Sequence, residues 1–412
     1  MIDNGNMTNG KGSQPLAGIR VLDFGHIVAG PFCVRLLADL GAEVVKVETS
    51  ARQGRTGARR GPPQRRTASG RTPHLAHINR NRWSIDLNLK TEHGRDVARR
   101  LVNVADVLVE NFSSGVMDRL GLGYRDLLRS NPRLIYTSMA SFGHTGPRSG
   151  WTGMNVTLQA CSGLMLATGD EGDPPIGISN SWNDYIGGLH AAVAIVGAVD
   201  RRRKTGQGCY LDVSQFECSV ATLGSLLFAS AVTGRPPVRH GSRSTTVSPQ
   251  GCYRCAGDDQ WCAISVQDDR QWQSLLKILG EHAAAFRSAE FATVAGRLER
   301  QNTIDLAIEA WTRSLAPADV ETQLTQVGVA AAAMRRGNNI AEVAEWQAVL
   351  RPLIDSSGSQ MNVIGMPFSF RNAAPIAVRE APRMGATGRE VLREWLNLDD
   401  QAIDALLTVV SA

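Results

Sequence analysis

The chain has 412 residues, of which 43% are hydrophobic and 20% are charged, and its formal net charge is +5. This is the composition of an ordinary globular protein with ample length for a large core and two domains. No apolar run approaches the ~20 residues that cross a bilayer, and residues 1–15 are polar, without the apolar core of a signal peptide. We therefore expect a flexible N-terminal tail on a cytoplasmic protein.

The excess of positive charge is modest and partly local to one stretch rich in Gly, Pro and Ser, residues 51–71. Its arginines are Arg52, Arg55, Arg59, Arg60, Arg65, Arg66 and Arg71. A nucleic-acid site would interleave aromatic with basic side chains, and this stretch has no aromatic residue, so we expect no nucleic-acid partner. Two interpretations of the stretch stay open: a solvated mobile loop, or a basic flap near a phosphorylated small molecule.

The first elements along the chain predict a strand–helix–strand unit. Residues 18–24 are a short apolar run of β-forming residues and predict a strand. Pro31 suits the first position of a helix that continues over 32–40 and that Gly41 ends. Residues 43–48 predict a second strand. Such a unit favours a parallel sheet with helices on its faces.

The same pattern continues toward residue 140. We predict strands at 82–87, 106–110 and 134–139, and an amphipathic helix with a Thr cap at 91–104. Ligands of such sheets bind beyond the carboxyl ends of the strands. The loops at that edge begin at Gly25, Glu48, Asn111 and Ala140. Because no G-x-G-x-x-G follows the first strand, a nicotinamide or flavin cofactor is disfavoured.

The second half of the chain predicts further helices and a smaller domain. Residues 184–204 predict a long apolar helix with four cations at its C-terminal end, followed by a strand at 210–213 and a helix at 214–231. The sequence at 234–237 breaks the chain. Residues 245–335 mix strands, such as 261–265, with helices, such as 271–279, and predict an α+β domain. The last predicted helices are 388–396 and 399–409.

The seven cysteines do not predict a disulfide framework, because their number is odd and most of them stand alone. Cys252 and Cys255 have the spacing of half a zinc site, with Cys262 nearby. No second pair and no His at ligand spacing follow them, so we expect reduced thiols and no metal.

Five groups of motifs resemble the class III CoA-transferases, the CaiB/BaiF family. They are residues 16–24 with 29–31 and 37–48; 79–82 with 87–90; 105–112 with 115–124; 131–136 with 141–147; and 184–188 with 204–208. No single motif is diagnostic, but by their order and spacing across residues 16–215 the chain is identified as a member of this family.

The resemblance implies an α/β fold with a Rossmann-like parallel-sheet large domain, a smaller α+β domain and a C-terminal segment that returns to the large domain. It also implies a homodimer in which two chains interlock as linked rings. The expected division is a tail at 1–15, the large CoA-binding domain at 16–225, a linker and small domain at 226–340, and the returning segment at 341–412.

Asp184 matches the catalytic aspartate of the family. Its carboxylate, ionised at neutral pH, would attack an acyl-CoA to give a mixed anhydride, and the released CoA thiolate would then form an aspartyl-CoA thioester that the acceptor acid reopens. On local grounds alone, an Asp before an apolar helix is usually a cap. Gly187 and Gly188 follow one turn later, and they indicate either a close approach of backbone to a ligand or helix packing.

The resemblance also implies CoA contacts, with CoA and acyl-CoA as substrates and no tightly bound cofactor. The matching positions are His26, Val28, Ala29, Leu87, Asn88, Leu89, Lys90, Asn111, Phe112, Ser113 and Arg119. Lys90 and Arg119 would meet phosphate groups. For Arg119, a surface ion pair is the alternative. His26, taken by itself, is typical of a structural histidine.

The chain departs from some family members at four places. Thr49 stands where one transferase has an Arg, and the basic stretch just beyond it offers substitute charges. The glycine run that shields the site in formyl-CoA:oxalate transferases is absent between Gly241 and Gly251, which puts formyl or oxalate specificity in doubt. A frequent Gly-Glu-His-Thr motif is replaced at 385–388. The Gly-His-Asp motif of the related α-methylacyl-CoA racemases is Gly, Met and Asn at 153–155.

The function predicted from these residues is transfer of CoA from a donor, such as succinyl-CoA or another short acyl-CoA, to an acceptor carboxylic acid. Two alternatives remain: a racemase-like isomerase, and a CoA-binding subunit of a hetero-oligomeric transferase. The sequence does not identify the acids. Arg243, Arg254 and Arg270 are candidates to bind a second carboxylate, although each is more typical of a surface residue.

Overall fold

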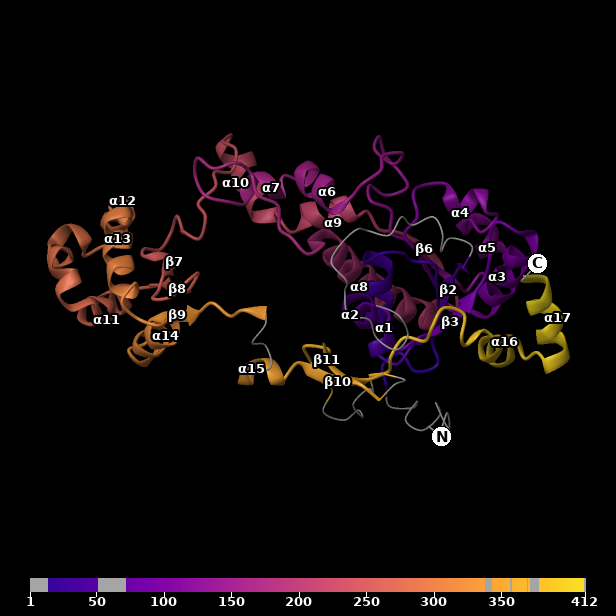
Figure 1. The fold of residues 1–412 in the computed structure, drawn as a ribbon. Coiled ribbons are helices and arrows are strands. Elements are labelled where there is room, and N and C mark those ends of the chain that lie inside the picture. Colours follow the sequence, from indigo (N-terminus) through magenta and orange to yellow (C-terminus); the bar gives the residue numbers. More distant parts are fainter. Residues whose placement is uncertain are drawn as a thin grey trace. The chain divides into compact units, whose positions relative to one another are not determined.

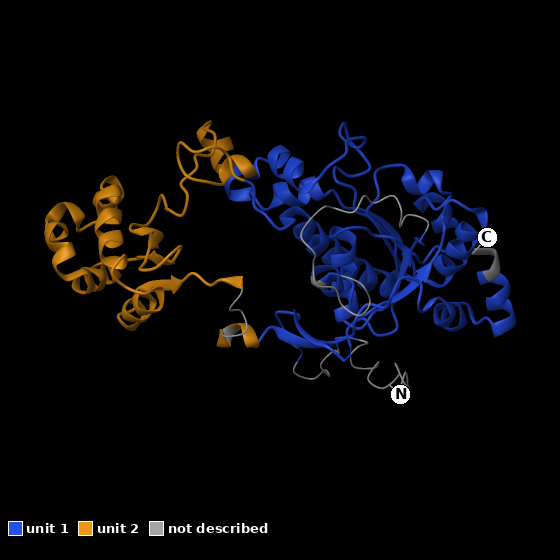
Figure 2. Cartoon of the chain, in the orientation of Figure 1, with its two compact units in different colours: residues 1–164, 177–228, 348–412 blue, residues 165–176, 229–347 orange. Residues whose placement is uncertain are grey.

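The computed structural model describes residues 14–50, 72–337, 343–355, 358–368, 370 and 378–410 (Figure 1). The basic stretch 51–71 lies outside these residues. The chain divides into two compact units (Figure 2). Unit 1 contains residues 1–164, 177–228 and 348–412, and unit 2 contains residues 165–176 and 229–347.

Unit 1 is built around a six-stranded, fully parallel sheet with the strand order β3-β2-β1-β4-β5-β6. The strands are β1 (Arg20–Asp23), β2 (Glu43–Glu48), β3 (Trp83–Asp86), β4 (Val107–Glu110), β5 (Ile135–Ser138) and β6 (Cys209–Asp212). This is the doubly wound order of dinucleotide-binding folds, in which ligands bind where the strand order reverses. Here that point lies between β1 and β4.

Two hydrophobic clusters cover the two faces of the sheet, because successive strand residues point to opposite sides. Val21 contributes to one cluster and Leu22 to the other. The first cluster includes helices α1 (Ala29–Asp39) and α8 (Trp182–Thr205). The second includes α3 (Glu92–Val104), α16 (Gly388–Leu396) and α17 (Asp400–Val410), which lie side by side in Figure 1.

The C-terminal segment joins unit 1 through polar contacts as well as through α16. A hairpin of β10 (Leu350–Ile354) and β11 (Gln360–Ile364) is tied to α1 by Arg80, which donates to the Ile364 carbonyl at 2.6 Å and pairs with Asp39 at 2.5 Å. At the replaced family motif, the Thr387 hydroxyl accepts from the Ser84 backbone N–H at 2.7 Å. Residues 303 positions apart are therefore joined at β3.

Unit 2 is a small α+β body. Its antiparallel sheet consists of β7 (Gln250–Arg254), β8 (Trp261–Ser265) and β9 (Ala330–Ala333). Its helices include α11 (Asp269–Leu279), α12 (Val294–Glu299), α13 (Gln301–Thr312), α14 (Pro317–Gln326) and α15 (Ala344–Gln347). Trp272, which is fully buried, lies in its core. The predicted fold class, a Rossmann-like parallel sheet together with a smaller α+β part, is confirmed.

Most of the remaining helices belong to unit 1, and two of them correct a prediction. They are α2 (Pro73–Ile78), α4 (Val116–Arg119), α5 (Tyr124–Ser130), α6 (Asn155–Ser162), α7 (Leu164–Ala167), α9 (Gln215–Ala221) and α10 (Gly224–Thr233). The single helix predicted over 214–231 is wrong: the chain bends by 66° between α9 and α10, next to Gly224. No single helix among the described residues has the length and hydropathy of a membrane span, and the bent pair α9 and α10 reaches them only when both are counted together.

Candidate active site

The loops after β1 and β4 are clamped together at the point where the strand order reverses. The Asn111 side chain accepts from the backbone N–H of His26 at 2.6 Å and donates to the His26 carbonyl at 3.0 Å. Gly30 permits this approach, since a Cβ there would lie 3.3 Å from the Asn111 side-chain oxygen and 2.8 Å from the Gly25 Cα. The two loops therefore form one rigid rim.

A buried cluster of charges supports this rim from behind. Asp23, at the end of β1, is fully buried and pairs with Arg82 at 2.6 Å and Lys46 at 3.2 Å. Arg82 also donates to the Pro31 carbonyl at 2.9 Å, which ties the start of α1 to β3. The sequence motifs contain these residues, but their pairing across 59 positions has no signal in local periodicity.

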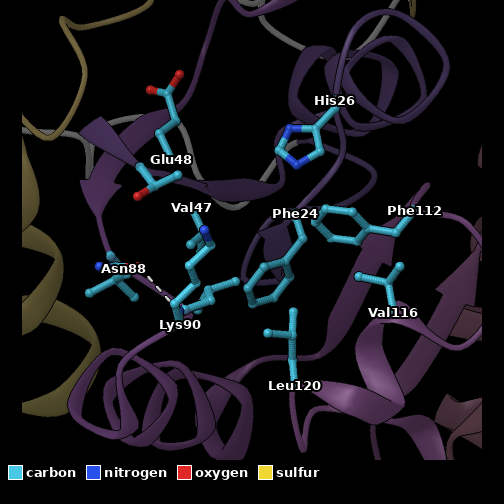
Figure 3. Close-up of a pocket in the computed structure, with 12 residues that line it drawn as sticks. Phe24, His26, Val47, Glu48, Asn88, Lys90, Phe112, Val116 and Leu120 are labelled. Carbon is cyan, nitrogen blue, oxygen red and sulfur yellow. Dashed lines mark hydrogen bonds between the residues drawn. The ribbon is translucent and has the colours of Figure 1, made fainter. Parts of the chain in front are cut away.

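A pocket opens along the carboxyl ends of the strands, with an empty volume of about 720 Å³ that includes the solvent at its mouth. It is lined by Phe24, His26, Val47, Glu48, Thr49, Leu87, Asn88, Leu89, Lys90, Phe112, Val116 and Leu120 (Figure 3). Six of the residues predicted to contact CoA lie together here: His26, Leu87, Asn88, Leu89, Lys90 and Phe112. The other lining residues were not predicted as contacts, although the loop at Glu48 was expected at this edge.

The pocket has an aromatic wall and a polar wall. In Figure 3, the rings of Phe24, His26 and Phe112 lie on one side, and Asn88 and Lys90 lie on the other. The rings of His26 and Phe112 meet edge to face with centroids 4.7 Å apart. Such a pair fixes the position of both rings and presents an apolar surface to a planar ligand.

Three polar side chains of the pocket differ in how they are held. Asn88 accepts from the Lys90 backbone N–H at 3.1 Å, and the Lys90 side chain is exposed. Glu48 accepts from the Ser84 hydroxyl at 2.6 Å. The Thr49 hydroxyl is buried, and no described residue gives it a hydrogen bond. A buried hydroxyl in this state favours a partner supplied by a ligand or by water.

The remaining predicted CoA contacts lie beside the pocket rather than in its lining. Val28 precedes α1 and Ala29 begins it, and both are buried. Asn111 is the clamp described above. Ser113 is exposed. Arg119 ends α4, is exposed, and has no ion-pair partner among the described residues, so the alternative of a surface ion pair is not seen in that part of the chain.

Asp184 lies in the first turn of α8 and is partly buried. It is the third residue of that helix, because the helix begins at Trp182, two residues earlier than predicted. Burial raises the pKa of the Asp184 carboxyl, while hydrogen bonds from its own backbone N–H and from that of Ala29 oppose the rise. Ala29 is the first residue of α1, so the carboxylate lies at the N-terminal ends of two helices, where the helix dipoles favour negative charge.

A chain of side-chain amides holds the first turn of α8. Asn155 accepts from the Asn183 backbone N–H at 3.2 Å and from Gln159 at 3.1 Å, so its oxygen is fully engaged. The Asn183 side chain donates in turn to the Ser219 hydroxyl. These contacts join α6, α8 and α9 next to Asp184.

The two glycines after Asp184 serve helix packing. A Cβ at Gly188 would lie 2.8 Å from the Phe32 ring and 3.0 Å from the Ala29 carbonyl, and a Cβ at Gly187 would lie 3.0 Å from Gln215. Gly187 therefore allows α8 to approach α9, and Gly188 allows it to approach α1 closely. This close approach brings Asp184 to the Ala29 N–H.

Other candidate residues are engaged elsewhere. Arg243 pairs with Asp305 at 2.7 Å, and Arg254 stacks over the Trp261 ring at 4.6 Å. Within the described ranges, no group of three or more His, Cys, Asp or Glu side chains could hold a metal ion, and all seven cysteines are unpaired.

Comparison with known proteins relates this geometry to a family. The sequence matches the model of CoA-transferase family III over residues 16–387. The acetyl-CoA:oxalate CoA-transferase of Acetobacter aceti is 34% identical over 303 residues, which are 73% of this chain and 76% of that protein. The succinate–glutarate CoA-transferase of Agrobacterium fabrum is 31% identical over 400 residues, 94% of this chain and 97% of that protein.

A solved structure agrees with the sequence relatives. A CaiB/BaiF family protein from Brucella suis has a TM-score of 0.84 and 30% identity, and the match covers 93% of this chain and 100% of that chain. The family model spans most of the chain, and the fold and the relatives agree with it. The chain therefore belongs to CoA-transferase family III and is an enzyme that transfers CoA from an acyl-CoA to a carboxylic acid.

Proposed function

We propose that Asp184 is the nucleophile and that it carries CoA as an aspartyl-CoA thioester. Its carboxylate attacks the thioester carbonyl of the donor and releases CoA thiolate, which leaves a mixed anhydride. The thiolate attacks the aspartyl carbonyl and expels the donor acid. The acceptor carboxylate then attacks this thioester, and CoA returns to the new acyl group through the same steps in reverse.

The position of Asp184 supports this role. Two backbone N–H groups meet the carboxylate, and no ion pair to it is present among the described residues. A carboxylate held by neutral donors stays nucleophilic, whereas a strong ion pair would reduce its reactivity. The same N–H groups would stabilise the negative charge that forms on the attacked carbonyl oxygens.

We further propose that the nucleotide part of CoA binds in the pocket along β1 to β4. The aromatic wall suits the adenine ring of CoA, and Lys90 and Arg119, which has no ion-pair partner among the described residues, suit the CoA phosphate groups. One observation carries the assignment: the loop after β1 supplies His26 to the pocket and, three residues later, the Ala29 N–H to Asp184. A single CoA molecule can therefore extend from one to the other.

For the acids, we propose a dicarboxylate acceptor and a short acyl-CoA donor such as succinyl-CoA. The two relatives described above are named for oxalate and for succinate and glutarate, which are all dicarboxylic acids. The missing glycine run between Gly241 and Gly251 favours glutarate-like acids over oxalate.

The geometry favours transfer over racemisation. A racemase needs acid and base groups on two faces of the α-carbon. At the matching position this chain has Asn155, whose amide oxygen already accepts two hydrogen bonds and cannot take up a proton at neutral pH.

We propose that the active enzyme is the interlocked homodimer of its family. Helix α8 exposes Leu189, Val193 and Val196, with Val193 72% exposed, on the side opposite its buried residues. A helix that is apolar all round is normally covered on both sides.

The unpaired cysteines suit a reducing compartment, and we expect the enzyme in the cytoplasm.

The purified chain tests this function directly. It should move CoA from succinyl-CoA to glutarate without any second polypeptide, and intact-protein mass spectrometry should detect a CoA adduct on the chain. Asp184→Ala should abolish the adduct and reduce transfer by at least ~10³-fold. Asp200→Ala, which removes an exposed carboxylate from the same helix, should leave both unchanged. If Asp184→Ala transferred CoA at the wild-type rate, Asp184 would be ruled out as the nucleophile.

A further inference from the structure

Glu110 lies at the carboxyl end of β4, directly behind the aromatic wall of the pocket. It is 1% exposed, and one of its carboxylate oxygens, Oε2, accepts from the Phe112 backbone N–H at 2.8 Å. Phe112 lines the pocket and meets His26 edge to face. Glu110 itself is not among the lining residues, so it affects a ligand only through the wall that it supports.

The second carboxylate oxygen of Glu110 faces His144, from the loop after β5. The Oε1 atom lies 3.6 Å from His144 Nε2, just beyond hydrogen-bond distance. Both atoms are buried, and no described residue gives either of them a hydrogen bond. The backbone N–H of His144 is anchored on the Asp212 carboxylate at 3.0 and 3.1 Å. Two buried polar atoms, one at the end of β4 and one on the loop after β5, thus face each other without a partner among the described residues.

The surroundings of this pair favour a neutral carboxyl group. Burial raises the pKa of Glu110 to about 7, with smaller upward contributions from Asp212 and Asp118, against hydrogen bonds from Ser138 and Phe112. Tyr136 and Tyr210 are the nearby phenols: the pKa of each is raised mainly by burial and further by Glu110, and the Tyr136 hydroxyl donates to the Leu122 carbonyl at 3.1 Å. None of the groups that shift the pKa of Glu110 is a cation. A hydrogen bond between Oε1 and Nε2 would satisfy both atoms, and one added proton lets it form without leaving a negative charge buried.

We propose that Glu110 and His144 are a proton-sharing positioning pair for the CoA pocket. The inference rests on the proposed function, in which this pocket binds CoA. When the pair takes up one proton from solvent, its two facing atoms close to hydrogen-bond distance. The loop that carries His144 is then held against the wall at Phe112. When the proton is lost, the pair carries a buried negative charge beside Asp212, and the wall is less well ordered.

The experiment measures binding of free CoA to the full-length chain by calorimetry, from about pH 5.5 to about pH 8.5, which brackets neutral pH. Wild type is compared with Glu110→Gln, whose side chain has the same shape and stays neutral. The ratio of the two Kd values cancels the titration of CoA itself and of every other residue. We expect wild type to lose affinity relative to Glu110→Gln as the pH rises through 7, by about three- to tenfold.

Two substitutions at His144 separate positioning from simple loss of structure. His144→Ala should weaken CoA binding at every pH. His144→Gln should restore binding, because its amide can form a hydrogen bond with the Glu110 carboxyl group in either protonation state. His282→Gln, which removes an exposed histidine from unit 2, is the matched control and should behave as wild type.

The outcomes are distinct. A Kd ratio for Glu110→Gln that stays constant across this pH range would overturn the proposal, and so would wild-type binding by His144→Ala. If wild type does not bind CoA at all, the proposed function fails instead. If His144→Ala does not fold, the Glu110→Gln and His144→Gln series still decides the question.

Discussion

The pocket is proposed to bind the phosphate groups of CoA, and the N-terminal end of α8 holds the Asp184 carboxylate. The two regions use different parts of the chain to stabilise this negative charge. The pocket has an aromatic wall and a polar wall, and the cationic side chain of Lys90 on the polar wall is exposed. Asp184 is met by backbone N–H groups at two helix ends. A substrate phosphate can be held by flexible cations in water, whereas a nucleophile needs fixed donors that leave its charge available.

The charges that are buried lie behind both regions. Asp23, Arg82 and Lys46 form a closed cluster beneath the loop that joins the pocket to Asp184. This cluster holds the loop, while the surfaces that meet ligand contain no buried ion pair among the described residues. The residues that shape the site are therefore different from the residues proposed to contact substrate. Substitutions in each group test this difference.

The largest expected effect comes from the shared support. Arg82→Met removes the partner of a fully buried carboxylate, and it should lower the free energy of unfolding by about 3–5 kcal/mol, because Asp23 is left without its strongest ion pair. Urea denaturation measures the change. Arg129→Met removes an exposed pair with Asp126 and should have little effect. Equal losses in the two variants would contradict the assigned role of the cluster.

The next effect concerns only the α8 end of the site. Gln159→Met removes the donor to Asn155 and loosens the first turn of α8, so we expect kcat to fall about tenfold, with the KM for acyl-CoA nearly unchanged. Steady-state kinetics with succinyl-CoA and glutarate separates the two constants. Thr157→Val, on the same helix but bonded only to Met154, is the control. A rise in KM alone would place Gln159 in binding.

A smaller effect of the opposite kind is expected in the pocket. Lys90→Ala removes an exposed cation that is proposed to meet phosphate, and it should raise the KM for acyl-CoA about fivefold while kcat stays unchanged. The difference from wild type should shrink at high salt, because exposed charges are screened. If kcat for Lys90→Ala fell while KM stayed constant, the pocket would not differ from the α8 end in serving binding rather than chemistry.

The smallest effect is a shift in pH dependence. Burial raises the pKa of Asp184, and a protonated carboxyl is not a nucleophile. The rate of adduct formation should therefore fall as the pH drops through this raised pKa, at a pH above the ~3.9 of an ordinary Asp. Rapid mixing with succinyl-CoA at different pH values measures how the rate of adduct formation depends on pH. If the rate falls only at or below the pKa of an ordinary Asp, the two N–H groups lower the pKa of Asp184 by more than burial raises it.

Much of the fold follows from the sequence because local patterns repeat. The strands predicted at 43–48 and 261–265 have exactly the observed bounds, and Thr91 caps α3 as predicted. The residues at the carboxyl ends of the strands, such as His26 and Phe112, meet in one pocket because parallel strands end at one edge. The break between α9 and α10 was missed, since Gly224 in an apolar run is compatible with a continuous helix.

The sequence by itself determined the alternation of strands and helices, the edge of the sheet where ligands bind, and the motifs that identify Asp184. These depend on residues that are neighbours along the chain. Only the tertiary structure decided what surrounds them: the Ala29 N–H at Asp184, the pairing of Asp23 with Arg82, and the unpaired atoms of Glu110 and His144. Such contacts join residues tens to hundreds of positions apart. Their hydrogen bonds and pKa shifts arise only when packing removes water from both partners.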